Sequence, residues 1–237
     1  MMTTKVITTF NQQLYRDYAH RFWNTFPHGE LDLTIYSEDA LPIPHKTLTY
    51  HRAFVERNAH KKTTNFKLDA VRFCYKPYAI AQCLEEECGS GDYERILWID
   101  ADTIFLKAID EKWIDHRLDA IDTVMTYMGR LNYHSETGLL LFNLRHGHTK
   151  RFIHTVREYY DTQRIYLLDE YHDSYVWDYV RRQFEHQGYK FNDVGDSVNK
   201  HKGGHIQAYR FGEWMDHTKG KRKLQGYSSE NIHSNNK

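Results

Sequence analysis

Short runs of apolar and β-branched residues alternate along the chain with longer stretches whose apolar positions recur three or four residues apart. The short runs are typical of strands and occupy residues 5–10, 31–36, 95–99, 123–127 and 138–144. The longer stretches are typical of amphipathic helices and occupy residues 16–26, 68–87, 150–163 and 174–186. This alternation predicts an α/β fold in which helices flank a central, mostly parallel sheet.

The chain has 237 residues, which is enough for one substantial hydrophobic core. Only four prolines occur, and no Gly/Ser-rich or single-charge tract separates two halves. We therefore expect a single domain over residues 1–225, followed by a polar and flexible tail over residues 226–237. We expect Asp173 or Ser174 to cap the last long helix, because both side chains accept hydrogen bonds from a first helical turn.

The charge balance is zero, with 32 basic and 32 acidic residues. This balance argues against a surface that binds nucleic acid over its whole area, although it leaves room for a local basic patch. Eighteen tyrosines suit either ordinary packing or a cleft for sugars and nucleotides.

The cysteines Cys74, Cys83 and Cys88 are odd in number and do not form a disulfide framework. The first ten residues are too polar for a signal peptide, and no apolar run is long enough to span a bilayer. We therefore expect a soluble cytoplasmic protein with reduced thiols.

The most informative segment is the strand over residues 95–99 together with the acidic residues that follow it. A nearly continuous apolar run, as in a strand covered on both faces, ends in Asp100-Ala101-Asp102. Two neighbouring carboxylates at the end of a buried strand repel each other and resist desolvation. A divalent cation removes both costs, and Mg²⁺ and Mn²⁺ prefer such oxygen ligands. An ordinary turn, in which one aspartate bonds to its own backbone, explains the same triplet.

With its flanking strands, this D-x-D motif resembles that of the GT-A glycosyltransferases, in particular the retaining family 8 group that includes glycogenin and bacterial galactosyltransferases. The resemblance implies a single GT-A (Rossmann-like) domain. It also implies a nucleotide-sugar donor, which in this group is a UDP-sugar, a Mn²⁺ or Mg²⁺ cofactor, and transfer to an acceptor hydroxyl with retention of configuration.

Four further islands extend this resemblance over most of the chain. Arg72 and Lys76 match basic positions of the helix before the D-x-D strand, and they lie on one helical face. Residues 135–144 resemble the family's strand that holds the sugar, with Gly138 in the turn and Glu136 departing from the usual pattern. Residues 169–177 occupy the place of an Asp-Gln pair, of which Asp173 is present and the glutamine is absent.

The fourth island contains His217, Gly220 and Lys223, which fit the family's H-x-x-G-x-x-K element. The resemblance implies that His217 is the third protein ligand of the metal beside Asp100 and Asp102. It also implies that Gly220 and Lys223 bind the diphosphate, with help from Lys219 or Lys221. Taken alone, His217 would be read as an ordinary surface histidine. The lysines would be read as a solvated basic stripe.

The remaining site residues are predicted from their position. Thr9, Phe10 and Asn11 end the first strand, where they can meet the base and ribose of the donor. Tyr36 ends the second strand and is a candidate for stacking on the base. Asp173 and Glu136 are the candidate catalytic carboxylates, which would orient the acceptor or shield the positively charged sugar.

Three alternatives stay open at this point. A nucleotidyltransferase would use the same carboxylates, although its usual glycine-rich loop is missing after the first strand, where the sequence reads FNQQLYRDYAHR. A non-catalytic sugar- or nucleotide-binding module would keep the same fold. The acceptor could be a glycan, a small molecule or, through the basic cluster at residues 219–223, a modified nucleic acid such as DNA. An oligomer that completes the acceptor side is also compatible with so short a chain.

Overall fold

The computed structural model describes residues 3–195, 210–218, 220 and 222–226. The central sheet has the strand order β3-β2-β1-β4-β7-β6-β8. The pairs β1–β2, β1–β4, β2–β3 and β6–β8 are parallel, whereas β7 runs antiparallel to both of its neighbours. The predicted α/β fold with a mostly parallel sheet is confirmed.

The strands of this sheet have the following bounds: β1 (Thr4–Thr9), β2 (Asp32–Ser37), β3 (Lys46–Thr47), β4 (Arg95–Ile99), β6 (Met125–Arg130), β7 (Tyr133–Asn143) and β8 (Asn192–Asp193). A separate two-stranded ribbon pairs β5 (Thr103–Phe105) with β9 (Met215–His217).

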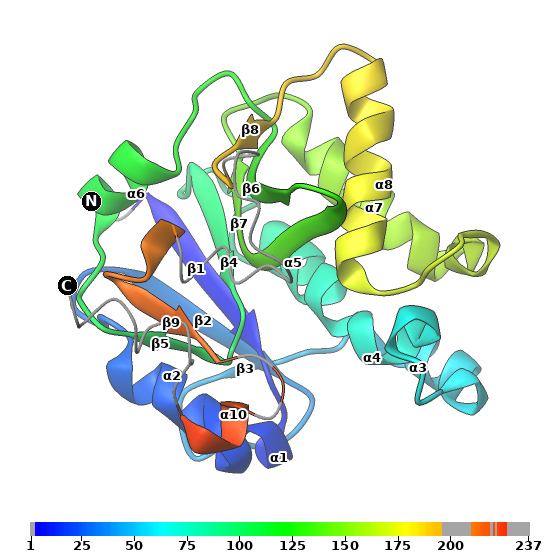
Figure 1. The fold of residues 1–237 in the computed structure, drawn as a ribbon, viewed down its shortest axis with the longest axis horizontal. Coiled ribbons are helices and arrows are strands. Elements are labelled where there is room, and N and C mark those ends of the chain that lie inside the picture. The colour runs from blue at the N-terminus through cyan, green and yellow to red at the C-terminus, as the bar shows by residue number, and fades with distance from the viewer. Residues whose placement is uncertain (1–2, 196–209, 219, 221, 227–237) are drawn as a thin grey trace.

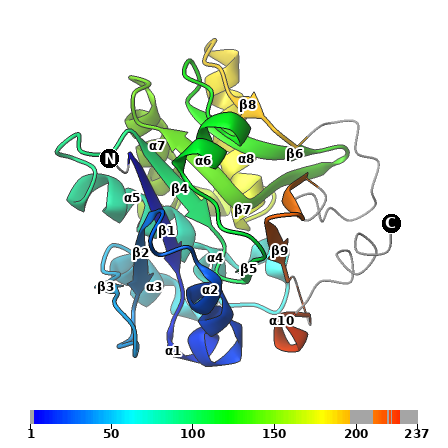
Figure 2. The same ribbon diagram turned by 90° about the vertical axis from the view of Figure 1, so that its left-hand side faces the viewer.

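Helices cover both faces of the sheet (Figures 1 and 2). One face packs against α5 (Tyr75–Glu86), α7 (Thr149–Asp161) and α8 (Asp173–His186), whose apolar residues share one buried cluster with Ile96 and Trp98 of β4. The opposite face packs against α2 (His20–Thr25), α6 (Glu111–Arg117) and the β5–β9 ribbon, where Leu97 and Ile99 of β4 are buried. Strand β4 is therefore covered on both sides, which explains its continuous apolar sequence.

The shorter helices are α1 (Gln12–Leu14), α3 (Arg52–Asn58), α4 (Ala70–Phe73) and α10 (Arg222–Gln225). Single turns of other helical types cover Tyr15–Ala19, Ala59–Lys61, Phe66–Leu68 and Arg164–Leu167. Within the described residues, no helix is both long and apolar enough to cross a membrane. Except for Gly226, the expected polar tail lies outside the described residues.

Two predicted helices are interrupted. A π-helical turn at Tyr15–Ala19 separates α1 from α2, so the helix expected over residues 16–26 is not continuous. The helix expected over residues 68–87 is divided at Cys74 into α4 and α5. Pro77 lies in the first turn of α5, and because it has no N–H group it cannot bond back to the preceding turn.

The predicted cap of α8 is wrong. The residue before the helix is His172, which makes no side-chain cap, and Asp173 is already the first helical residue. The Asp173 carboxylate accepts the N–H of the next residue, Ser174, at 2.8 Å, and it pairs with Lys76, whose Nζ lies 2.6 Å from Oδ2.

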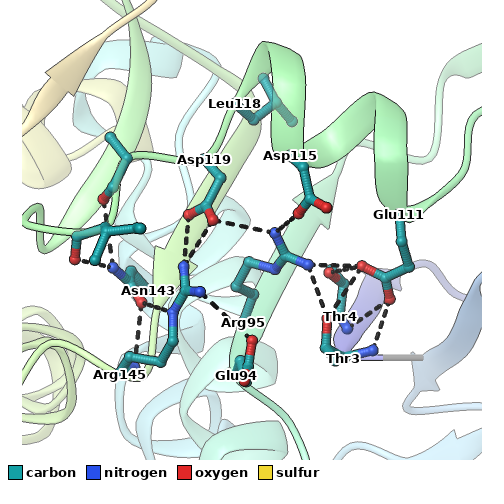
Figure 3. Close-up of polar contacts among 12 residues, drawn as sticks. Thr3, Thr4, Glu94, Arg95, Glu111, Asp115, Leu118, Asp119, Asn143 and Arg145 are labelled. Atoms are coloured by element: carbon teal, nitrogen blue, oxygen red, sulfur yellow. Dashed lines mark hydrogen bonds and ion pairs between the residues drawn. The ribbon is translucent and has the colours of Figure 1, made fainter. Parts of the chain in front are cut away.

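A buried ionic cluster joins the start of the sheet to α6 (Figure 3). Arg95 is almost fully buried and contacts Glu111 at 2.8 Å and Asp119 at 3.3 Å, and it also pairs with Asp115. Glu111 in turn accepts hydrogen bonds from the backbone N–H groups of Thr3 at 2.7 Å and Thr4 at 2.8 Å. These contacts fix the first residues of β1 and β4 relative to each other. They thereby fix the register of the two strands, whose ends lie side by side.

Candidate functional site

The two aspartates lie in a tight turn between β4 and β5. The backbone N–H of Asp100 donates to the carbonyl of Gly138 on β7 at 2.8 Å, and the Asp100 carbonyl accepts from Thr103 at 3.0 Å. Asp102 is buried, whereas Asp100 is partly exposed. This turn directs both carboxylates to the edge of the sheet where the parallel strands end, which is where α/β proteins bind ligands.

The β5–β9 ribbon brings His217 to this turn. Thr103 is the register partner of His217, and both the N–H and the hydroxyl of Thr218 donate to the Asp102 carbonyl, at 2.9 and 2.8 Å. The imidazole Nε2 consequently lies 2.9 Å from Asp102 Oδ1 and 3.8 Å from Asp100 Oδ2. Each of the three side chains offers a ligand atom, and these atoms all lie within 4.8 Å of one another.

The chemistry of this cluster fits a divalent cation. Burial alone would raise the pKa of Asp102, but His217 and Lys223 hold that pKa well below its usual value, so the carboxylate is ionised. Among the described residues, Nδ1 of His217 makes no hydrogen bond and lies 3.9 Å from Oε1 of Glu136. A carboxylate on that side is the usual partner of a metal-binding imidazole, because it orients the ring and leaves the other nitrogen to the metal.

Two lysines are paired with the acidic residues. Lys76 is buried, and its ammonium lies 3.0 Å from Asp100, 2.6 Å from Asp173 and 2.8 Å from the carbonyl of Thr137. Lys223 lies 2.7 Å from Oδ2 of Asp102. Burial would lower the pKa of Lys76, but Asp100 and Asp173 raise it above its usual value. Burial would also raise the pKa of Asp173, and Lys76 lowers it, so this pair is ionised.

A cleft of about 480 Å³ opens beside the two aspartates. Its walls contain ten of the predicted site residues: Thr9, Phe10, Asn11, Arg72, Lys76, Asp100, Ala101, Asp102, Asp173 and Lys223. They come from the ends of β1 and β4, from α4, α5, α8 and α10, and from the residues next to them. Segments far apart in the sequence therefore meet at one cleft.

The structure places Tyr36 away from this cleft. Its side chain is fully buried, and its hydroxyl donates to Glu87 at 2.5 Å. Glu87 also holds Lys5 at 2.9 Å, which makes this a structural ionic cluster. The hypothesis that Tyr36 stacks on the donor base is corrected, because successive side chains of a strand face opposite sides and this one faces the core.

Glu136 also lies outside the cleft. Its Oε1 accepts the N–H of Gly138 at 3.1 Å, and its side chain is almost fully buried behind the His217 ring. This position corrects the expectation that Glu136 is a catalytic carboxylate that orients the acceptor or shields the positively charged sugar. Gly138 itself is a backbone partner of Asp100 and does not line the cleft.

Gly220 lies in the turn between β9 and α10 and has a φ of +61°, a conformation that favours glycine. Its carbonyl accepts the N–H of Lys223 at 3.2 Å, so the turn positions Lys223 at the cleft. The predicted helpers Lys219 and Lys221 lie outside the described residues.

Several residues of the cleft were missed by the sequence analysis. Trp98 donates its indole N–H to Asp100 at 2.7 Å, and Lys223 lies over the ring of Tyr18 at 4.8 Å. Asp69 caps α4 through the N–H of Arg72, and its side chain also lines the cleft. The Trp98 contact had a signal in the sequence, since residues two apart on a strand share a face.

No protein-family model matches the sequence, and no curated protein does. Solved structures do match. One is the crystal structure of a glycosyltransferase involved in the glycosylation of the major capsid of PBCV-1, with a TM-score of 0.50 and 14% identity over 97% of this chain and 98% of that one. The chain has the GT-A glycosyltransferase fold.

Two further solved structures match with lower TM-scores. The galactosyltransferase LgtC in complex with donor and acceptor sugar analogues has a TM-score of 0.41 and 14% identity, over 72% of this chain and 68% of that one. The bifunctional glycosyltransferase WbbM, in its apo form, has a TM-score of 0.46 and 9% identity, over 93% of this chain and 46% of that one.

Proposed function

We propose that the protein is a metal-dependent glycosyltransferase that takes a sugar from a nucleotide-sugar donor, and that the donor is a UDP-sugar. The observation that carries this proposal is the convergence of Asp100, Asp102 and His217, whose ligand atoms lie within 4.8 Å of one another beside a cleft of about 480 Å³. The GT-A fold supports it. Mixed oxygen and nitrogen ligands of this kind suit Mn²⁺, and Mg²⁺ is the alternative.

Asp100, Asp102 and His217 would hold the cation, with Glu136 orienting the imidazole. When bound, such a cation neutralises the negative charge that develops on a departing diphosphate. On the protein side, Lys223 lies next to Asp102 and would supply a second positive charge to the diphosphate, as backbone and ammonium donors do at phosphate sites. Gly220 would allow the turn that presents this lysine.

The nucleoside would occupy the part of the cleft formed by the end of β1. Thr9 is fixed there by its hydrogen bond to the Tyr36 carbonyl at 2.8 Å, and Asn11 caps α1 through the N–H of Leu14 at 2.9 Å. Arg72 is exposed at the cleft, with its guanidinium 5.5 Å from the Phe73 ring centre. This guanidinium would contact the donor.

The sugar would lie near Asp173, which is an ionised carboxylate at the wall of the cleft. Its charge would favour the positive character that the sugar ring acquires as the glycosidic bond breaks. Lys76 and Thr137, 2.6 and 3.0 Å from Oδ2, fix the carboxylate in place. We propose that transfer occurs with retention of configuration, to an acceptor hydroxyl on a glycan or a small molecule.

The proposal is tested by a thermal-shift panel of nucleotide-sugars with and without Mn²⁺, followed by assays of donor hydrolysis. One UDP-sugar is expected to raise Tm only when Mn²⁺ is present, since a ligand that binds only the folded state stabilises it. Asp102→Asn is expected to remove both the shift and the hydrolysis. Asp122→Asn, at an exposed aspartate outside the cleft, is the matched control and should keep both.

Other outcomes separate the alternatives. Release of pyrophosphate from a nucleoside triphosphate would identify a nucleotidyltransferase. Donor binding with undiminished biological activity in Asp102→Asn would identify a non-catalytic binding module. Filter binding to DNA over a salt series would show a steep salt slope if the acceptor is a nucleic acid.

A further inference from the structure

A second cluster of metal-ligating side chains lies outside the cleft. His134 is at the start of β7, and Glu170 and His172 precede α8. Oε2 of Glu170 lies 2.8 Å from Nε2 of His172 and 3.7 Å from Nε2 of His134. Ligand atoms of all three residues lie within 4.8 Å of one another. Two imidazoles and one carboxylate make up the protein ligand set of many zinc sites.

Other atoms of these side chains contact neighbouring residues, and the ligand atoms face one another. Glu170 uses Oε1 to accept from Lys67 at 2.7 Å, so Oε2 remains for the histidines. Nδ1 of His134 faces Oδ2 of Asp178 at 3.9 Å. Asp178 is itself fixed by the N–H and hydroxyl of Ser135, at 2.8 and 2.6 Å. A carboxylate behind an imidazole is the arrangement that orients metal-binding histidines.

Aromatic side chains lie next to the two histidines of the cluster. Phe66 and Phe73 lie with ring centres 5.8 and 6.2 Å from His172, and Tyr175 lies 5.1 Å from His134. His172 is buried, and the other two residues are half-buried.

We propose that His134, Glu170 and His172 form a zinc site, separate from the cluster of Asp100, Asp102 and His217. Its two nitrogen ligands favour Zn²⁺ over Mg²⁺ and Mn²⁺, which prefer oxygen. A water molecule or a substrate group would complete a tetrahedral set. This inference does not depend on the proposed transferase activity.

The site would join two segments that are distant in the sequence. His134 lies three residues before Thr137 on β7, and His172 immediately precedes Asp173 on α8. Thr137 donates to Asp173 at 3.0 Å. Bound zinc would therefore fasten the loop before α8 to β7 next to the carboxylate that lines the cleft, and it would stabilise that part of the fold.

The experiment uses the full chain without an affinity tag, stripped of metal and titrated with Zn²⁺ by calorimetry. Asp102→Asn serves as the background, because that substitution weakens the other metal cluster. This protein is expected to bind one Zn²⁺ per chain and to gain thermal stability. Co²⁺ in its place is expected to give the visible absorption of a tetrahedral site with nitrogen ligands.

Adding His134→Ala or Glu170→Gln should abolish the Zn²⁺ binding and the cobalt spectrum, while the metal-free Tm stays close to that of the background. Asp178→Asn should lower zinc affinity roughly 10- to 100-fold, the usual effect of removing the group behind a ligand histidine. His116→Ala, at an exposed histidine on α6, should change nothing. Absence of Zn²⁺ binding, or equal binding after His134→Ala, would show that the cluster is an ordinary ion-pair network and would overturn the proposal.

Discussion

Replacing Lys76 with methionine tests how the acidic residues of the cleft are held. Methionine keeps most of the volume of the side chain and removes its charge. Lys76 is buried and contacts both Asp100, at 3.0 Å, and Asp173, at 2.6 Å. Without it, the buried Asp173 carboxylate loses its cationic partner. Removing one partner of a buried ion pair costs about 3 to 5 kcal/mol, which is roughly 6 to 20 °C in Tm for a domain of this size.

The pH dependence gives a second readout of the same substitution. In the wild type, the pKa of Asp173 is lowered in the folded state, so its contribution to stability is present above the unfolded pKa and is lost as pH falls through the folded pKa. The folded pKa of Lys76 is raised, so its contribution is lost only as pH rises through that value. In Lys76→Met, burial should raise the pKa of Asp173. The variant should therefore recover part of its stability as pH falls from 7 towards 5, where the wild type gains nothing from Asp173.

The assay is thermal unfolding in EDTA at several pH values, because a bound cation would compensate the lost charge at Asp100. Asp173→Asn in the Lys76→Met background is the matched control, since it removes the stranded carboxylate. This double variant should be more stable than Lys76→Met alone. Equal stability of the single and double variants, or a Lys76→Met protein as stable as the wild type, would refute the view that Lys76 holds a buried charge pair.

Two further substitutions test the structural ionic clusters. Tyr36→Phe removes the hydrogen bond to Glu87 and should lower the free energy of unfolding by about 2 kcal/mol, measured by denaturant titration, without changing the affinity for a nucleotide. If the affinity for a nucleotide falls by more than the loss of stability explains, Tyr36 contributes to nucleotide binding and the correction is wrong. Glu111→Gln should cost about 1 to 2 kcal/mol in the same titration, because Arg95 keeps two other carboxylates. An unchanged midpoint would show that the contacts of Glu111 in Figure 3 do not contribute to stability.

The sequence predicted the central strand and its acidic end well. Strand β4 has the expected bounds of residues 95–99, because a strand covered on both faces leaves a continuous apolar run that ends abruptly at Asp100. His217 was linked to Asp100 and Asp102 only through the resemblance of the C-terminal element to that of the family 8 glycosyltransferases, and the structure does bring the three together.

The directions of individual side chains were harder to predict. Tyr36 lies at the expected strand end, but the sequence does not show which of the two faces of β2 borders the cleft. The partner that holds its hydroxyl, Glu87, is contributed by the chain segment after α5. Glu136 was predicted as a catalytic carboxylate, but its side chain lies 3.9 Å from Nδ1 of His217 and does not line the cleft, a position that depends on how the β5–β9 ribbon packs.

Other contacts between distant segments were not predicted. His134 and Glu170 lie outside the strands and helices that the sequence predicts, and nothing in their local sequence indicates that the β6–β7 hairpin approaches the loop before α8. The same holds for the Arg95 cluster, whose carboxylates come from α6 and the residues after it.

The most direct test of the central claim is a titration of Mn²⁺ in the presence of UDP, followed by the electron paramagnetic resonance signal of free Mn²⁺. The wild-type chain should remove one Mn²⁺ per chain from solution, because Asp100, Asp102 and His217 hold it against the diphosphate. His217→Ala should weaken this binding at least 10-fold, while His116→Ala should leave it unchanged. Mn²⁺ binding that is equally strong in His217→Ala, or absent in the wild type with UDP present, would contradict a metal-dependent donor site at these residues.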